Sequence, residues 1–420
     1  MSDLLALLTP EMKGFLLVTV AKLLVVFTVV MVGVALLTLM ERKVSAWMQN
    51  RLGPNRVGKG WLQPAADGLK NILKEETLPA SANPVIFTLA PAMAFIPAMT
   101  LSAVIPFAAP IPAFQFHLGL LGDFIYTGGI PSVVADLPVG FLFVLAISSL
   151  GVYGIALAGW SSNSKYSLLG GLRSSAQMIS YEVAMGLALV PVLLLSGNVS
   201  FTTIVADQQG TLLNWYVFPL FVSFFVYLVS GFAETNRLPF DLPEAESELI
   251  AGYHTEYSAM KFSMFFIAEY ANMVTVSAMV TTLFFGGWDI PFTHWDERAG
   301  WIQVLATGAF FFAKLMFWLF FFMWIRWTLP RFRYDQLMAL GWKVLLPVSL
   351  SYVMLVAVAV YVGSDLLHLT PFGLTGLLTG LSVVTGGALF YILDRGAVIG
   401  GSRARSGQPA RAPAGAAARS

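Results

Sequence analysis

A connecting segment near the middle of the chain is unusually rich in carboxylates. Residues 233–258, AETNRLPFDLPEAESELIAGYHTEYS, contain one arginine, Arg237, and one histidine, His254. Their acids are Glu234, Asp241, Glu244, Glu246, Glu248 and Glu256. Only 11% of the whole chain is charged, so this density is exceptional. Because crowded carboxylates raise one another's pKa and share protons, the segment has the chemistry of a proton relay or a charge-sensitive switch.

A structural role explains only part of this charge. Asp241, Pro243 and Glu244 have the order of a helix start, in which a capping residue, an early proline and first-turn acids complement the helix dipole. Glu244 and Glu248, however, would share one face of such a helix and repel each other. Helix capping therefore accounts for one or two of the acids, and we interpret the others as functional.

Four ionisable residues interrupt apolar stretches. Glu182 lies in SYEVAMG, Glu269 in FIAEYAN, Lys314 in FFAKLMF and Lys22 in the first apolar run. Each costs about 2.5–3.5 kcal/mol at the centre of a membrane helix, and such groups normally face an interior polar path. The alternative for each is a snorkelling or locally paired side chain. Together with the acidic segment, the two glutamates predict a hydrophilic line from that segment into the membrane.

Membrane-spanning helices must position these groups. The chain has 420 residues, of which 57% are hydrophobic, more apolar surface than a soluble domain can bury. Runs of about 20 apolar residues span a bilayer, and we expect eight, near residues 14–40, 85–107, 135–159, 177–196, 214–233, 260–285, 304–327 and 344–363. A ninth candidate, 372–393, contains several glycines. The predicted fold is an all-α polytopic integral membrane protein with eight core helices and this further candidate.

The basic residues predict how the chain is oriented. With the N-terminus outside, the outer segments offer only Lys13 and Arg298. The inner connections then hold Arg42, Lys43, Arg51, Arg56, Lys59, Lys70, Lys74, Lys165, Arg173, Arg237, Lys261, Arg326, Arg331, Arg333 and Lys343. Because Lys and Arg favour the cytoplasmic side, we expect the N-terminus outside and the acidic segment in the cytoplasm.

The composition excludes several classes of site. The chain has no cysteine, which rules out disulfides and iron–sulfur ligation by this chain. Its four histidines are scattered, no residues have metal-ligand spacing, and no Gly-rich nucleotide fingerprint is present. The net charge of +1 implies no bulk attraction to nucleic acid. We therefore predict no metal site, no redox centre and no nucleic-acid partner.

Two further connections have a distinctive composition. Residues 41–76 contain turn chemistry at Gly53 to Gly58 and then WLQPAADGLKNILKEE, the pattern of an amphipathic helix at the membrane surface. Residues 159–182, GWSSNSKYSLLGGLRSSAQMISYE, are polar and contain glycines, and we expect a short loop there. Both connections suit membrane-surface or docking elements.

Four stretches occur in order along the chain: ERKVSAWMQNRLGPNRVG, AGWSSNSKYSLLGGLRSSAQMISYE, ETNRLPFDLPEAESELIAGYHTEYS and LPRFRYDQLMALGWK. They resemble signature stretches of the H-subunit family of proton-pumping NADH:quinone oxidoreductase, respiratory complex I, over residues 10–363. The resemblance implies an eight-helix subunit of the bacterial inner membrane, placed where the peripheral arm meets the membrane arm. Quinone would be the substrate, whereas FMN and iron–sulfur clusters would belong to partner subunits, and no cofactor would be bound by this chain alone. The implied partners are the peripheral-arm iron–sulfur and quinone-site subunits, the small membrane-arm and antiporter-like subunits, and the lipid bilayer.

The resemblance also implies roles for individual residues, none of them catalytic, because electrons would arrive from a partner's cluster. The quinone tunnel and its mouth would use Arg42, Lys43, Arg51, Arg56, Lys70 and Phe240. The proton or charge path would use Asp136, Glu182, Asp241, Glu244, Glu246, Glu248, Glu256 and Glu269. Residues 1–363 would form the quinone-site unit. The family pattern does not cover 364–394, a candidate extra transmembrane helix, or 395–420, expected to be a disordered basic tail.

Two other functions fit part of this pattern. The equivalent subunit of a membrane-bound hydrogenase, or of a dehydrogenase with another electron donor, shares it, although the fuller agreement in residues 233–258 favours the quinone enzyme. A stand-alone ion-coupled transporter would explain buried acids without a redox partner. A transporter works alone, whereas a subunit of the enzyme would be inert outside its complex.

Overall fold

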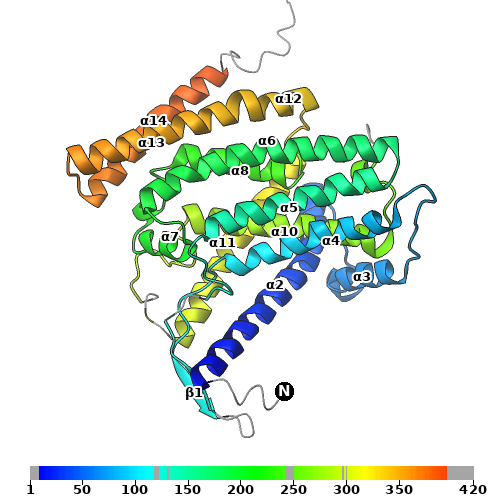
Figure 1. Ribbon diagram of the computed structural model, residues 1–420, viewed down its shortest axis with the longest axis horizontal. Coiled ribbons are helices and arrows are strands. Elements are labelled where there is room, and N and C mark those ends of the chain that lie inside the picture. The colour runs from blue at the N-terminus through cyan, green and yellow to red at the C-terminus, as the bar shows by residue number, and fades with distance from the viewer. Residues whose placement is uncertain are drawn as a thin grey trace, which may run out of the picture.

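The computed structural model describes residues 9–117, 123–129, 132–241, 250–295, 298 and 300–394. Eight helices in these ranges are long and apolar enough to cross a membrane, which confirms an all-α polytopic membrane protein. The long helices run in alternating directions between two ends of the molecule (Figure 1). We call one end the α3 end, after helix α3 (Gln63–Leu73), and the other the hairpin end, after strands β1 (Phe114–His117) and β2 (Asp123–Tyr126).

A central bundle carries the buried core. Its five mutually packed helices are α4 (Pro84–Leu101), α5 (Gly140–Ser161), α6 (Lys165–Ser196), α8 (Phe221–Glu234) and α10 (Ala259–Phe284). Around it lie α2 (Pro10–Met48), α11 (Trp301–Thr328), α13 (Leu346–Tyr361) and α14 (Pro371–Asp394) (Figure 1). Short helical segments fill connections: η1 (Gly58–Gly60), η2 (Ser102–Val104), α7 (Phe201–Asp207), η4 (Leu212–Asn214), η5 (Gly252–His254) and α12 (Tyr334–Ala339). Wider π-helical turns, Leu340–Leu345 and Val362–Leu366, flank α13.

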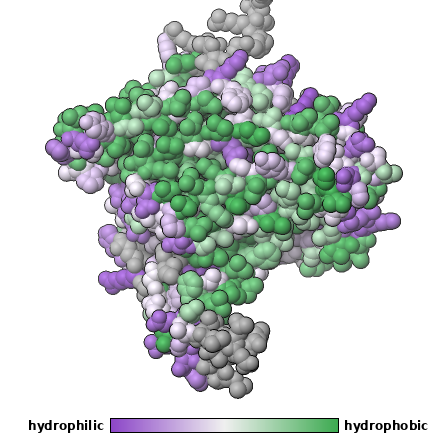
Figure 2. Space-filling model, viewed as in Figure 1, coloured by the Kyte–Doolittle hydropathy of each residue, from purple (hydrophilic) through white to green (hydrophobic). Residues whose placement is uncertain are grey.

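Local signals explain several helix ends. The Asn83 side chain accepts hydrogen bonds from the backbone N–H groups of Val85 and Ile86, and Pro84 occupies the first position of α4. Gly197 ends α6 in the left-handed conformation, with φ of 65°. Between such ends the helices keep many large hydrophobic residues exposed, and these cover much of the visible face in Figure 2. Soluble monomeric proteins rarely expose so large an apolar surface, so this surface indicates contact with lipid or with other membrane proteins.

The predicted loop over residues 159–182 is wrong for most of its length, because α6 begins at Lys165. Its glycines allow close packing. A Cβ at Gly170 would lie 2.6 Å from the Cα of Gly252, and one at Gly159 would lie 2.6 Å from the carbonyl oxygen of Ser167. The early start of α6 also places Glu182 near the middle of a long helix.

The predicted fifth span is shorter than expected. Helix α8 begins at Phe221, after Pro219, which has no N–H to continue a helix. The Pro219 carbonyl instead accepts hydrogen bonds from Tyr352 on α13, at 3.3 Å, and from Ser382 on α14, at 2.5 Å. The ninth candidate span, predicted over residues 372–393, is a regular 24-residue helix, α14. Helix α14 is one of the eight helices that are long and apolar enough to cross a membrane, whereas the 14-residue α8 is too short to be counted among them.

Sequence patterning did not predict the β-hairpin. Strands β1 and β2 pair antiparallel, with Phe114 opposite Tyr126. They lie against the first turns of α2, so closely that a Cβ at Gly14 would lie 2.1 Å from the carbonyl oxygen of Ile125. The hairpin therefore anchors the start of α2.

Lys314 has a local structural role inside α11. Its ammonium group donates to the carbonyl oxygens of Phe285, Gly287 and Asp289 at 2.7–3.0 Å. It also lies 4.7 Å from the ring centre of Trp215, a cation–π distance. The lysine thus satisfies carbonyls beyond the end of α10, which supports the locally paired alternative considered for it.

Candidate functional site

A cavity of about 730 Å³ lies between α2, α3 and α10 at the α3 end. Part of its wall is apolar, with Met31 and Val34 from α2 and Phe262 and Phe266 from α10. The rest is charged or polar, formed by Glu41, Arg42, Asp67, Lys70, Arg237, Asp241, His254, Glu269, Tyr270 and Arg326. We call it the amphipathic cavity. Its two kinds of wall suit a molecule with a polar head and a long apolar tail.

Buried ion pairs form the polar wall, and we call them the charged cluster. Glu41 pairs with Arg237 Nη1 at 3.1 Å, pairs with Arg326, and accepts a hydrogen bond from the Tyr270 hydroxyl at 2.5 Å. Arg237 Nε lies 2.5 Å from Glu269 Oε1. Two acids thus face two arginines, as buried charges require.

Arg237 is the centre of this cluster. It is only 4% exposed, and its guanidinium carbon lies 4.3 Å from the ring centre of Tyr270. Burial alone would lower the pKa of Arg237, but Glu269, Tyr270 and Glu41 outweigh burial and raise its pKa above the ordinary value. The cluster therefore holds a permanent cation between two carboxylates.

Two groups outside the spans also line the cavity. Burial raises the pKa of Asp241 above its ordinary value, although its ion pair with Arg331, at 3.2 Å, opposes this shift. Asp241 therefore takes up a proton more readily than an exposed aspartate. Burial lowers the pKa of His254 to about 4, and its ring packs against Tyr253 and Phe262. His254 is therefore neutral near pH 7.

A smaller cavity extends from the charged cluster into the bundle. It measures about 30 Å³, and its lining combines polar residues, among them Glu269, Glu234 and Asn272, with apolar ones such as Ile155 and Met178. The Oε2 atom of Glu234 is buried and has no hydrogen-bond partner among the described residues. A cavity of this volume has room for one or two waters beside the carboxyl groups of Glu234 and Glu269.

Glu234 lies within electrostatic range of Glu182. Glu182 is half-buried on α6 and accepts a hydrogen bond from Ser149 on α5. Glu269, Glu234 and Glu182 therefore form a line of acids from α10 through α8 to α6, which we call the acid line. It begins at the amphipathic cavity and enters the central bundle.

The predicted path residues are only partly brought together. Asp241 and Glu269 meet at the amphipathic cavity, and Glu182 ends the acid line. Glu256 lies half-buried in the connection that precedes α10. Asp136 lies at the hairpin end, where it accepts a hydrogen bond from Thr202 at 3.2 Å. The remaining three, Glu244, Glu246 and Glu248, lie outside the described residues.

Two of the predicted quinone-site residues line the amphipathic cavity. Arg42 does so while paired with Asp67 on α3 at 2.8 Å, and Lys70 projects from α3 itself. The amphipathic helix predicted in this connection is confirmed as α3, where Leu69 and Ile72 remain exposed. The amphipathic helix thus forms one wall of the cavity.

The other predicted quinone-site residues lie elsewhere. Lys43 is on another face of α2 and donates to the Lys59 carbonyl at 2.9 Å. Arg51 and Arg56 are exposed in the connection between α2 and α3. Phe240 is buried against Tyr181, with ring centres 5.4 Å apart, and packs in the core behind the cavity. None of these four lines the amphipathic cavity, although the backbone N–H of Phe240 donates to the carbonyl oxygen of Arg237 at 2.8 Å.

Sequence patterning missed several site residues. Glu41, Tyr270 and Arg326 complete the charged cluster, and Glu234 joins the acid line. One signal in the sequence could have identified Glu41 and Arg326 as partners. Glu41 and Arg326 have opposite charges at the ends of spans one and seven, and both ends were predicted on the same side of the membrane.

A family model described as NADH dehydrogenase matches residues 21–357. The NADH-quinone oxidoreductase H subunit 2 of Koribacter versatilis is 51% identical over 350 residues, covering 82% of this chain and 98% of the relative. The H subunit 1 of Geobacter sulfurreducens is 52% identical over 344 residues, covering 81% and 94%. The H subunit of Leptospira biflexa is 49% identical over 338 residues, covering 80% and 93%. The chain therefore belongs to the H-subunit family of NADH-quinone oxidoreductase.

Proposed function

We propose that the amphipathic cavity binds the quinone and that the acid line couples its reduction to proton movement. One observation carries the proposal: the cavity joins an apolar wall to a cluster of buried charges at the start of a line of acids. The quinone head would lie near the charged cluster. Its prenyl tail would lie against α2 and α10 and reach the bilayer.

The chemistry of the site fits this substrate. Reduction of a quinone to a quinol takes two electrons and two protons and places negative charge transiently on the ring oxygens. Electrons would come from an iron–sulfur cluster of a partner subunit. In this chain, Arg237 and Arg326 would stabilise the developing charge, while Tyr270 and Asp241 are placed to hydrogen-bond or exchange a proton at the head.

The acid line would carry the response into the membrane. A change of charge at the head alters the field at Glu269, which is paired with Arg237. Water in the small cavity would pass a proton between Glu269 and Glu234, and the electrostatic contact with Glu182 would extend the effect to α6.

The remaining predicted residues keep their proposed roles. The acids Glu244, Glu246, Glu248 and Glu256 would belong to the same proton or charge path. Arg51 and Arg56, exposed in the connection before α3, would belong to the mouth of the quinone tunnel. Asp136, at the hairpin end, would serve the opposite side of the membrane, with the N-terminus outside and the acidic segment in the cytoplasm.

The proposed position of the prenyl tail can be tested by placing a bulky side chain in the amphipathic cavity. Ala35 lines the amphipathic cavity six residues before Glu41, about 9 Å along α2. We expect Ala35→Phe to raise the KM for a long-tailed quinone at least about tenfold, the factor that 1.4 kcal/mol of lost contact gives, with kcat almost unchanged. A short-tailed quinone, which ends before Ala35, should be unaffected.

Val32→Phe is the matched control, because Val32 is exposed on α2 and does not line the amphipathic cavity. Steady-state kinetics of the purified enzyme would be measured for both variants. An equal KM for long-tailed quinone in Ala35→Phe and Val32→Phe would place the tail elsewhere.

Co-purification distinguishes a subunit of the quinone enzyme from a subunit of a related enzyme and from a stand-alone transporter. A tagged chain extracted in mild detergent should bring down flavin, iron–sulfur signals and inhibitor-sensitive NADH:quinone reductase activity. Iron–sulfur signals without NADH activity would instead support a hydrogenase-like or other-donor enzyme. A colourless single chain that moves ions in vesicles would support a transporter. The names of the relatives favour the first result.

A further inference from the structure

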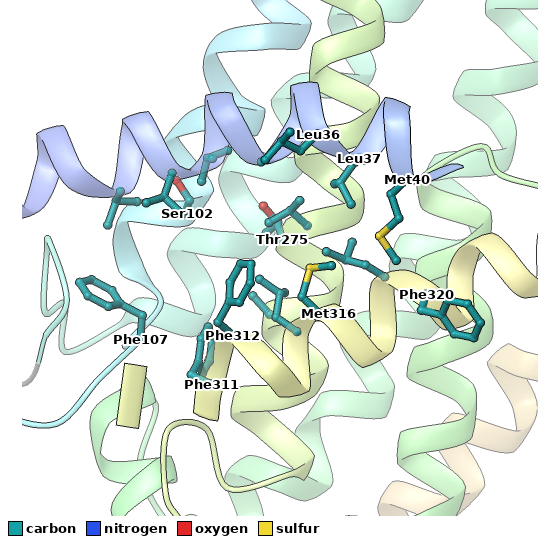
Figure 3. A pocket seen from close by; sticks show the side chains of 18 of the residues that line it. Leu36, Leu37, Met40, Ser102, Phe107, Thr275, Phe311, Phe312, Met316 and Phe320 are labelled. Atoms are coloured by element: carbon teal, nitrogen blue, oxygen red, sulfur yellow. The ribbon is translucent and has the colours of Figure 1, made fainter. Parts of the chain in front are cut away.

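A second large cavity, of about 610 Å³, lies on the opposite face of α2 from the amphipathic cavity. It is an open groove between α2 and α11, with part of α10 at its floor (Figure 3). Leu36, Leu37 and Met40 of α2 line one wall, and Phe312 and Met316 of α11 line the other (Figure 3). Apart from Lys43, Ser102 and Thr275, every lining side chain is apolar or the residue is glycine. We call it the α2–α11 groove.

The length of the groove identifies the kind of occupant that fits. Its residues on α2 run from Val25 to Trp47, about 33 Å at 1.5 Å per residue. The hydrocarbon core of a bilayer is about 30 Å thick. One lipid reaches through only one leaflet, about half of that distance, whereas a transmembrane helix runs through both. The groove therefore matches a helix in length.

Gly33 supports the same conclusion independently. It lies on the groove wall near the middle of α2, and a Cβ added there would meet no heavy atom within 4 Å. Glycine inside a helix costs about 1 kcal/mol relative to alanine, and no contact with the part of the chain that the structure describes requires it here. Gly308 lines the facing wall on α11, but a Cβ added there would already lie 3.5 Å from the Cβ of Ala108, so the open position is Gly33. Small residues at such positions let another helix approach closely in a membrane.

We propose that the α2–α11 groove receives a transmembrane helix of a neighbouring subunit of the same enzyme. The helix crosses α2 at Gly33 and carries no ionisable residue at that depth, because the groove offers only apolar partners there. Its polar end lies at the α3 end, beside Lys43 and the interfacial Trp47 and Trp61. The inference rests on the assembly of this chain into the multi-subunit enzyme and does not depend on the quinone site.

Photo-crosslinking in the intact enzyme tests the occupant. Benzoylphenylalanine would replace Phe312, which is 50% exposed in the groove, and separately Phe390, which is 75% exposed on α14. Illumination of native membranes should join the Phe312 probe to an apolar segment of a second polypeptide, identified by peptide mass spectrometry, and this adduct should be absent with the Phe390 probe. Only phospholipid adducts at Phe312 would show a lipid-filled groove, and only adducts within this chain would show a closed one. Either result would overturn the proposal.

A bulky side chain in the α2–α11 groove should displace the helix of the neighbouring subunit. We expect Gly33→Trp to lower recovery of the cross-linked partner at least about tenfold at equal amounts of this chain in the membrane. Gly380→Trp on α14 is the control, because a Cβ at Gly380 also meets no heavy atom within 4 Å. If Gly33→Trp prevents accumulation of the chain, Gly33→Leu replaces it with the same expected direction. Equal recovery from the groove and control variants would contradict the proposal, whatever the quinone kinetics of Ala35→Phe.

Discussion

Replacing Arg237 with methionine is expected to destabilise the folded chain by about 3–5 kcal/mol, because it leaves Glu41 and Glu269 as buried charges without their shared partner. A loss of this size is a large fraction of the free energy of unfolding of a typical domain, about 5–15 kcal/mol. The tagged chain should therefore reach the membrane in much smaller amounts, and the enzyme should lose it at a lower temperature. Both effects can be measured by quantitative immunoblotting and by thermal dissociation of the purified complex.

Arg42→Met is the control for this prediction, because the Arg42–Asp67 pair is largely exposed. Exposed pairs contribute about 0–1 kcal/mol, so that variant should accumulate almost normally. Arg237→Lys keeps the charge but loses the forked geometry that reaches both carboxylates, so an intermediate loss is expected. Normal accumulation and thermal stability of Arg237→Met would mean that the charged cluster does not hold the helices together.

Glu234→Gln is expected to lower proton-coupled quinone reduction by about 10²-fold, the size of effect typical of a lost proton-transfer group. Glutamine keeps the shape of the side chain beside the small cavity but cannot accept and release the proton. The enzyme should therefore assemble normally. NADH:quinone turnover and proton uptake into vesicles would be measured on the same preparation, with an artificial electron acceptor to report on the peripheral arm.

Glu11→Gln provides the comparison, because Glu11 is exposed in the first turn of α2 at the hairpin end. It should behave like the unmodified enzyme in every assay. We expect Glu182→Gln to resemble Glu234→Gln, since Glu182 continues the acid line. If Glu234→Gln retains full turnover and full pumping, Glu234 is not part of the path and the small cavity has only a structural role.

The membrane class and the family could be predicted because their signals are local. Each span is a continuous apolar run whose length reflects the bilayer thickness, and the family stretches are unbroken in the sequence. The buried acids Glu182 and Glu269 also stood out, because a charge within such a run is costly. Errors arose where a local signal had two explanations. The glycines at Gly159 and Gly170 were read as loop residues, although they permit close contact between packed segments.

The partners of each charge depended on the tertiary structure. Glu41 and Arg237 are 196 residues apart in the chain, yet they form one ion pair. Packing of α2, α10 and α11 around the connection after α8 also brings in Arg326 and Tyr270. Charge balance in a low-dielectric interior is a property of this three-dimensional neighbourhood, so no spacing rule along the sequence could predict it.

By itself, the sequence determined that this protein spans a membrane, which family it belongs to and that charge is concentrated near residues 233–258. Hydrophobic length, composition and contiguous motifs carry that information without reference to folding. Only the tertiary structure decided that α2 separates an amphipathic cavity from an apolar groove, and that Glu234 lies between Glu269 and Glu182. The physical reason is that cavities and buried electrostatics arise from the packing of helices distant in sequence, whereas each helix alone shows only its own apolar and charged residues.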